Sequence, residues 1–246
     1  MRPLDKKNFG DSITLFENIL DMHPQEHIIE EEYKDYGKAR KVLLANFGNY
    51  CSYCETYLAN GALFQTEHIQ PKGLPQYASL KTKWNNFLLS CATCNIKKGD
   101  DNVKYEEIHL PHKNNTLLSL VYKEAGVVEV NSNIPPTSQA HAQALVNLLK
   151  LDQPDSETDF RRDMRRKAWD RAMMYLKLYE AGDYELNAMI ADIKERSCWS
   201  IWFTVFKEHR EVREALVEQF PGTSRECFDG DFNPIPRHPK NQEDPI

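Results

Sequence analysis

No stretch of this 246-residue sequence approaches about 18 consecutive apolar residues, the length that a helix needs to cross a membrane. The first four residues, Met1-Arg2-Pro3-Leu4, also lack the charged and apolar regions of a secretory leader. Neither an internal repeat nor a low-complexity block appears. The sequence therefore predicts a globular protein of the cytoplasm, with a hydrophobic content of 41% that suffices for a substantial core.

Positive charge is scarce as well, because 31 basic residues face 37 acidic ones and the net charge is -6. Since neutralisation of phosphates supplies most nonspecific affinity for nucleic acid, such a chain binds nucleic acid only if basic residues are concentrated locally or a partner provides the contacts. One concentration stands between Phe160 and Arg171, with six basic residues and two acids. At about 100° per residue, four arginines of this run share the face opposite Phe160. They are Arg161, Arg162, Arg165 and Arg166. We expect either a nucleic-acid-binding stripe or a solvated helix face paired with neighbouring acids.

Only six cysteines are present, but four of them form two C-x-x-C clips, Cys51 with Cys54 and Cys91 with Cys94. Each clip directs two thiolates at one centre, and two clips complete the four-sulfur shell that zinc prefers. A closed shell leaves no position for a substrate, so we expect a structural zinc ion that contributes folding energy. The alternative is a pair of redox dithiols or unlinked thiols in a reduced protein. Cys198 and Cys227 stand alone and are expected to be ordinary thiols.

The residues between the clips predict a strand, a second strand and a short helix around one metal site. The run 63–69 has the apolar and β-branched content of a strand, and Asn60-Gly61 before it is typical of a two-residue hairpin turn. Side chains alternate along a strand, so Glu67 and His68 should face opposite sides unless the strand end re-aims one of them. After Cys94, a short helix should end at Gly99.

A histidine here suits hydrolysis of phosphodiesters, because its ordinary pKa of about 6.5 lets it accept a proton from water near neutral pH. A divalent ion beside it would neutralise the scissile phosphate and stabilise the leaving oxygen. A lone histidine is more often a satisfied structural residue, however. Only the surrounding pattern favours a catalytic role for His68.

That pattern, Glu67-His68-Ile69-Gln70-Pro71, then Trp84-Asn85-Asn86-Phe87, then Cys91-Ala92-Thr93-Cys94-Asn95, resembles the HNH endonucleases. The resemblance implies that His68 is the general base, that Asn86 holds the loop and orients His68, and that Asn95 stands where many members have their last histidine. Glu67 and Asn95 would be ligands of a catalytic ion, and their oxygen donors suit Mg²⁺ or Mn²⁺. Lys98 would add a phosphate contact.

The elements along the chain indicate an α+β fold, in which a small ββα-metal core stapled by the four-cysteine site is embedded in a mostly α-helical protein. Apolar spacing predicts helices over 11–20 and 36–47, and Val127–Val130 is the best strand of a short hairpin. Beyond Pro135 and Pro136, helices are expected over 138–150, 157–181, 183–208 and 209–220. The expected regions are N-terminal helices over 1–48, the nuclease core over 49–112, a connecting segment over 113–136, a helical region over 137–228 and a loose proline-rich tail over 229–246.

The stretch Gly48-Asn49-Tyr50-Cys51, the residues from Trp84 to Cys94 and the helical C-terminal half also resemble the PtuB-type nuclease subunit of Septu anti-phage defence systems. That resemblance implies a separate ATPase of the ABC or SMC kind (PtuA-type) as partner, sometimes within a retron cassette. The helical region, including Trp199 and Trp202, would be its docking surface, although plain helix packing also explains these aromatic residues. Three functions stay open: a DNA endonuclease, an RNA- or tRNA-cleaving effector of the same complex, and a non-catalytic zinc-stabilised scaffold that binds nucleic acid or a partner.

Overall fold

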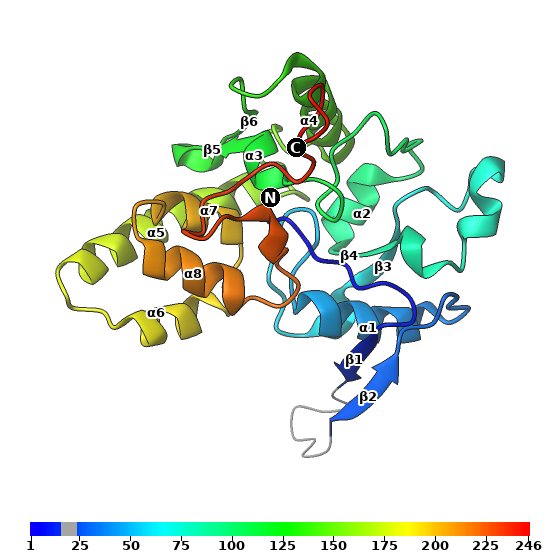
Figure 1. Ribbon diagram of the computed structural model, residues 1–246, viewed down its shortest axis with the longest axis horizontal. Coiled ribbons are helices and arrows are strands. Elements are labelled where there is room, and N and C mark those ends of the chain that lie inside the picture. The colour runs from blue at the N-terminus through cyan, green and yellow to red at the C-terminus, as the bar shows by residue number, and fades with distance from the viewer. Residues whose placement is uncertain (16–23) are drawn as a thin grey trace.

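The computed structural model describes residues 1–15 and 24–246 and is mixed α+β (Figure 1). Within these residues, three separate antiparallel pairs of strands form: β1 (Ser12–Leu15) with β2 (Gln25–Ile28), β3 (Gln65–His68) with β4 (Phe87–Ser90), and β5 (Leu120–Tyr122) with β6 (Val128–Val130). The helices are α1 (Tyr36–Phe47), α2 (Ala92–Lys98), α3 (Thr116–Ser119), α4 (Pro136–Leu149), α5 (Arg161–Glu180), α6 (Leu186–Ile193), α7 (Trp199–Val205) and α8 (Arg210–Glu218). No helix in the described part of the chain is both long and apolar enough to span a membrane.

The N-terminal region contains one of the two expected helices. The prediction of a helix over 11–20 is wrong for Ser12–Leu15, which pairs as a strand with Gln25–Ile28, while 16–20 lie outside the described residues. The pairing explains the error, because it supplies backbone partners from beyond the local sequence. Helix α1 is confirmed: the Asp35 side chain accepts a hydrogen bond from Gly37 N at its start, and Gly48 ends it with a φ of 72°.

The expected strand, strand and helix between the cysteine clips are present as β3, β4 and α2. In the β3–β4 pair, His68 lies opposite Phe87 and Gln65 opposite Ser90. The hairpin turn expected at Asn60-Gly61 is wrong, because the Asn60 side chain instead caps a short 3₁₀ helix over Gly61–Leu63. The strands are joined by the long loop 69–86. This loop brings the backbone of Lys81 next to His68, at the end of β3.

The expected hairpin around Val127–Val130 is confirmed as β5 and β6, and its turn packs tightly on α5. Gly126 adopts a φ of 73°, and a Cβ atom there would lie 2.1 Å from the carbonyl oxygen of Arg162. Only glycine permits this approach of the backbone.

The C-terminal half is helical, but the expected helix over 183–208 is two helices, α6 and α7. The helical conformation is interrupted between α6 and α7, and Cys198 adopts a left-handed φ of 68° just before α7. Trp199 and Trp202 of α7 are each only 1% exposed, so their expected role in a docking surface is wrong. They fill the interior between α5, α7 and α8, which occupy the side of the molecule away from β3 and β4 in Figure 1.

The last 18 residues do not form a loose tail. Phe232 and Ile246 are buried, and the Ile246 carbonyl accepts a hydrogen bond of 2.7 Å from Asn115 N. The carboxylate of Asp244 contacts two histidines of the body. Prolines prevent regular structure in this segment but leave its side chains free to pack, which explains why composition alone misled.

Candidate functional site

Four buried thiols converge where the two cysteine clips meet. The Sγ atoms of Cys51, Cys54, Cys91 and Cys94 all lie within 4.8 Å of one another, and those of Cys54 and Cys91 are 3.6 Å apart. A tetrahedral zinc site with Zn–S bonds of about 2.3 Å places its sulfurs about 3.8 Å apart, whereas a disulfide would need about 2.05 Å. The four cysteines therefore fit a structural zinc ion and not a pair of disulfides.

An arginine from the helical region reaches this thiol cluster. Arg161 Nη1 donates to Cys94 Sγ at 3.4 Å, and the same guanidinium pairs with Asp159 at 2.9 Å. Burial lowers the pKa of Arg161, but its bond to Asp159 and the Cys94 thiolate together raise it above the ordinary value. A cation in this position stabilises the thiolate form that binds metal.

Neither interpretation of the basic run, a nucleic-acid-binding stripe or a solvated face paired with acids, holds for Arg161 and Arg165, whereas Arg166 fits the second. Arg161 is buried at the thiol cluster, and Arg165 is buried with bonds to the carbonyls of Gly126 and Leu151. Arg162 is partly exposed, and the exposed Arg166 pairs with two acids of its own helix, Asp163 and Asp170. Helical periodicity groups the four arginines on one side of α5, but it could not show that packing divides them, with Arg161 and Arg165 buried and Arg162 and Arg166 reaching solvent.

His68, the last residue of β3, is held with one ring nitrogen occupied. Its Nε2 atom lies 2.9 Å from the carbonyl oxygen of Lys81, and a carbonyl only accepts, so Nε2 carries the proton and Nδ1 carries the lone pair. The rings of Tyr36 and Phe87 pack edge-on against the imidazole at 5.0 Å each. Burial lowers the pKa of His68 below its usual value, which keeps the ring neutral near pH 7. His68 is thus prepared to accept a proton at Nδ1.

The side chain of Asn86 forms hydrogen bonds near both ends of the loop segment 70–81, which supplies the Lys81 carbonyl. Its side chain accepts from Gln70 N at 2.8 Å, donates to Gln70 O at 2.9 Å and donates to Leu80 O at 3.3 Å. Leu80 immediately precedes Lys81, whose carbonyl holds the ring of His68. The expected role of Asn86, to hold the loop and orient the histidine, has this physical basis.

Glu67 and His68 contact different helices, since Glu67 pairs with Lys98 of α2 and His68 packs on Tyr36 of α1, but the charge of Lys98 acts on both side chains at this strand end. Glu67 is buried toward α2, where its carboxylate pairs with Lys98 Nζ at 2.9 Å. Burial raises the pKa of Glu67 against the opposing effect of Lys98. Lys98 is 1% exposed, so a phosphate contact from it would require this pair to break. The ion pair shows that the surroundings of the Glu67 carboxylate accommodate a positive charge.

Asn95 lies on the same side, where its amide nitrogen donates to the side chain of Gln65. Gln65 and Glu67 share one face of β3, so Asn95 and Glu67 border the same space between β3 and α2. Among residues 1–15 and 24–246, no hydrogen bond joins Glu67 to Asn95 directly. Their carboxylate and amide oxygens are the donors that Mg²⁺ or Mn²⁺ prefers, so the residues present fit a hard divalent ion.

Sequence reasoning missed three residues near this site. Tyr36 packs on His68 from α1, the exposed Lys72 lies over the Tyr36 ring at 5.0 Å, and Asp100 acts electrostatically on Glu67. Lys72 and Asp100 flank the motif closely enough in sequence to have been noticed. The signal for Tyr36 is tertiary, because α1 precedes both clips.

Comparisons with known proteins agree with this geometry. A family model of HNH endonuclease matches residues 51–101. Septu protein PtuB of Bacillus thuringiensis is 40% identical over 70 residues, which cover 28% of this chain and 26% of that protein. Septu protein PtuB of Bacillus mycoides is 36% identical over 76 residues, covering 26% and 25%. The matched stretches thus span about a quarter of the length of these relatives. Residues 51–101 form an HNH endonuclease domain, carried by a chain that resembles the Septu protein PtuB.

Proposed function

We propose that this chain is a metal-dependent endonuclease that hydrolyses phosphodiester bonds of nucleic acid, with DNA as the favoured substrate. The observation that carries the proposal is the hydrogen bonding, and therefore the tautomer, of His68 within the segment that matches the HNH family. Its Nε2 is bound to the Lys81 carbonyl, so Nδ1 is the atom that accepts a proton from the attacking water.

The surrounding residues support this role in distinct ways. Asn86 keeps the Lys81 carbonyl in place and so fixes the tautomer of His68. Glu67 and Asn95 would hold a Mg²⁺ or Mn²⁺ ion. When bound, such an ion supplies the positive charge that neutralises the scissile phosphate and stabilises the leaving oxygen. Lys98 neutralises Glu67 when the ion is absent and must yield that carboxylate when it binds.

The biological setting is part of the same proposal. Similarity to the Septu protein PtuB supports a role in anti-phage defence in the cytoplasm, together with an ABC- or SMC-type ATPase of the PtuA type. The net charge of -6 and the burial of Arg161 and Arg165 support an arrangement in which the partner provides much of the grip on nucleic acid. Cleavage of RNA or tRNA by the same complex is the alternative that the substrate test must separate.

The decisive experiment compares wild type with His68→Ala, each purified together with the PtuA-type ATPase that we propose as its partner. Duplex DNA and total tRNA are offered together with Mg²⁺, and the degraded polymer identifies the substrate. His68→Ala should cut at least about 100-fold more slowly, because the proton acceptor is gone. His209→Ala is the matched control, since that ring pairs with Glu180 on the surface and should not affect cutting.

Zinc content and circular dichroism keep a loss of activity distinct from a loss of fold. Equal cutting by wild type and His68→Ala would reject His68 as the base. If the wild-type complex cuts neither polymer with Mg²⁺ or Mn²⁺, the proposal fails and a zinc-stabilised scaffold is the better description.

A further inference from the structure

A second cluster of metal-ligating side chains lies outside the nuclease domain. His109, His141 and Asp244 each direct one ligand atom to a common point, and these atoms all lie within 4.8 Å of one another. His109 comes from the segment between α2 and α3, His141 from α4, and Asp244 from the C-terminal segment. Three distant parts of the chain thus meet at one carboxylate.

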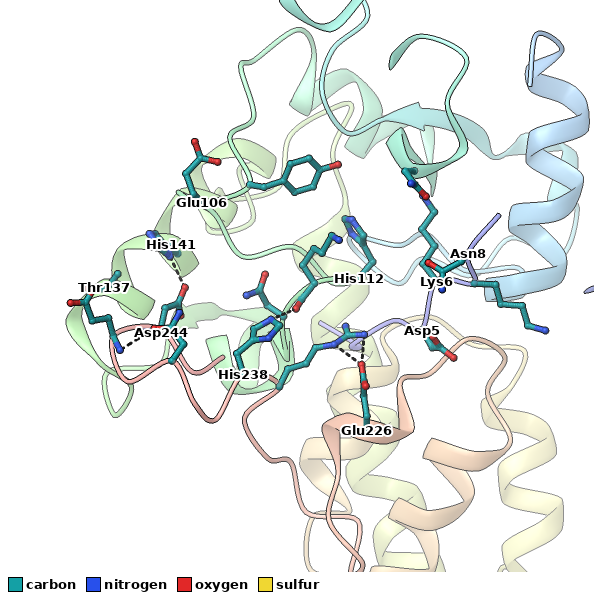
Figure 2. A pocket seen from close by; sticks show the side chains of 18 residues that line it. Asp5, Lys6, Asn8, Glu106, His112, Thr137, His141, Glu226, His238 and Asp244 are labelled. Atoms are coloured by element: carbon teal, nitrogen blue, oxygen red, sulfur yellow. Dashed lines mark hydrogen bonds and ion pairs between the residues drawn. The ribbon is translucent and has the colours of Figure 1, made fainter. Parts of the chain in front are cut away.

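The contacts in this cluster are specific. Asp244 Oδ1 lies 2.9 Å from His109 Nε2, and Asp244 Oδ2 lies 2.7 Å from His141 Nδ1. Ser138 Oγ also donates to Asp244 Oδ1 at 2.7 Å. Figure 2 shows His141 and Asp244 facing each other across one wall of a cleft of about 1090 Å³.

His109 has a partner on each ring nitrogen, as histidine ligands of metals do. Its Nδ1 lies 2.8 Å from Ser119 Oγ, and the ring is fully buried. A hydroxyl can donate or accept. Ser119 therefore satisfies Nδ1 both when Nε2 carries the proton, as beside Asp244 alone, and when Nε2 gives its lone pair to a metal and the proton moves to Nδ1. The second state is the outer-shell hydrogen bond that fixes a metal-binding histidine.

We propose that His109, His141 and Asp244 bind a divalent transition-metal ion of the Zn²⁺ class, which fastens the C-terminal segment to α4 and to the residues before α3. Two imidazoles with one carboxylate favour zinc and its neighbours over Mg²⁺, which prefers oxygen ligands and water. A tetrahedral shell with bonds of about 2.1 Å sets its ligand atoms about 3.4 Å apart. Binding therefore needs Asp244 to draw back slightly from both rings, and no rearrangement of the fold.

The test uses Co²⁺ as probe on the full chain with its cysteine clip filled, in a Glu67→Gln background that removes a proposed ligand of the nuclease ion. We expect one further equivalent of Co²⁺ to bind, with the weak visible absorption of nitrogen and oxygen ligands and without the intense bands of thiolates. Asp244→Asn and His141→Gln should each weaken this binding by more than about 100-fold, because losing an outer-shell partner alone costs about 10- to 100-fold. His238→Ala, which removes a ring that bonds the Lys113 carbonyl in the same cleft, should leave it unchanged.

A second readout follows hydrogen exchange in the C-terminal segment. Co²⁺ should slow exchange at residues 241–246 in the parent protein but not in Asp244→Asn, a variant that keeps a hydrogen-bond acceptor and so should still fold. Absence of a further equivalent, or binding that is the same in all four proteins, would overturn the proposal and leave the cluster as a hydrogen-bonded clasp. Neither result depends on nuclease activity.

Discussion

The thiol cluster and the His109, His141 and Asp244 cluster are both convergent sets of metal-ligating side chains, but they are assembled over very different distances in the chain. Cysteines in the first come in pairs three residues apart, and one short segment contains all four. Members of the second are separated by 32 residues and then by a further 103. The first cluster organises a local domain, whereas the second ties the end of the chain to its body.

We therefore expect that the loss of one ligand affects the stability of the protein differently in the two clusters. The nuclease domain is built around its thiols, since Cys91 caps α2 by accepting from Cys94 N and Arg161 brings in the helical region. The second cluster joins segments that also have other attachments, such as the bond from Asn115 N to the Ile246 carbonyl. Loss of a thiol should therefore disrupt the fold, whereas loss of a ligand in the second cluster should loosen one segment.

The largest expected effect is that of Cys91→Ser. Serine removes one of the four sulfur ligands, although its hydroxyl can still cap α2, so the protein should lose its zinc and with it its cooperative unfolding transition. Zinc per chain by mass spectrometry and thermal unfolding by circular dichroism measure both. Cys227→Ser is the control, because that thiol is buried away from the cluster and should leave the zinc content unchanged. A soluble Cys91→Ser protein that still cuts nucleic acid would contradict a structural role for the metal.

A smaller but still large effect is expected for Arg161→Ala. This change removes the closest partner of the buried Asp159 carboxylate, which keeps only Lys97 at 3.6 Å, and it removes the cation beside Cys94, so it should destabilise the protein by about 3 kcal/mol. Urea unfolding measures the loss, and a zinc chelator should remove the metal faster than from wild type.

The matched control for Arg161→Ala is Arg166→Ala, five residues further along α5. Arg166 is exposed and pairs with two acids of its own helix, Asp163 and Asp170, so stability should be nearly unchanged. Equal stability losses in the two variants would mean that Arg161 gives the thiol cluster no special support.

Local patterns accounted for the parts of the molecule that depend on neighbours in sequence. The clips, the strand at Gln65–His68, the helix that ends at Gly99 and the helix over Tyr36–Phe47 all follow from spacing, alternation and capping within a few residues. The convergence of the four thiols is confirmed. The roles of Glu67, His68, Asn86 and Asn95 stay predictions, now with geometry that supports them.

Most of the errors share one physical cause, which is long-range packing, and the turn at Asn60-Gly61 is the local exception. Nothing near Ser12 indicates that it pairs with Ile28, and nothing near Asp244 indicates that two histidines lie beside it. Likewise, the arginine spacing on α5 predicted one common face, but Arg161 and Arg165 are buried by contacts with Cys94 and Gly126 from other regions, whereas Arg166 stays exposed. The polarity of an arginine therefore does not reveal its exposure, because the sequence is the same whether the residue is buried with full hydrogen bonding or solvated.

The smallest effect, and the sharpest contrast with Arg161, is expected for Ser119→Ala. Ser119 supports His109 as Arg161 supports Cys94, but it contributes one neutral hydrogen bond and no charge. Without metal, its loss should cost about 1 kcal/mol in urea unfolding. With Co²⁺, affinity at the second cluster should fall about 10- to 100-fold, because the ring of His109 is no longer fixed. The exposed Ser132→Ala should change neither quantity. A Ser119→Ala protein as destabilised as Arg161→Ala would show that the second cluster carries as much of the fold as the thiols do, and that the distinction between a local organiser and a remote fastening is wrong.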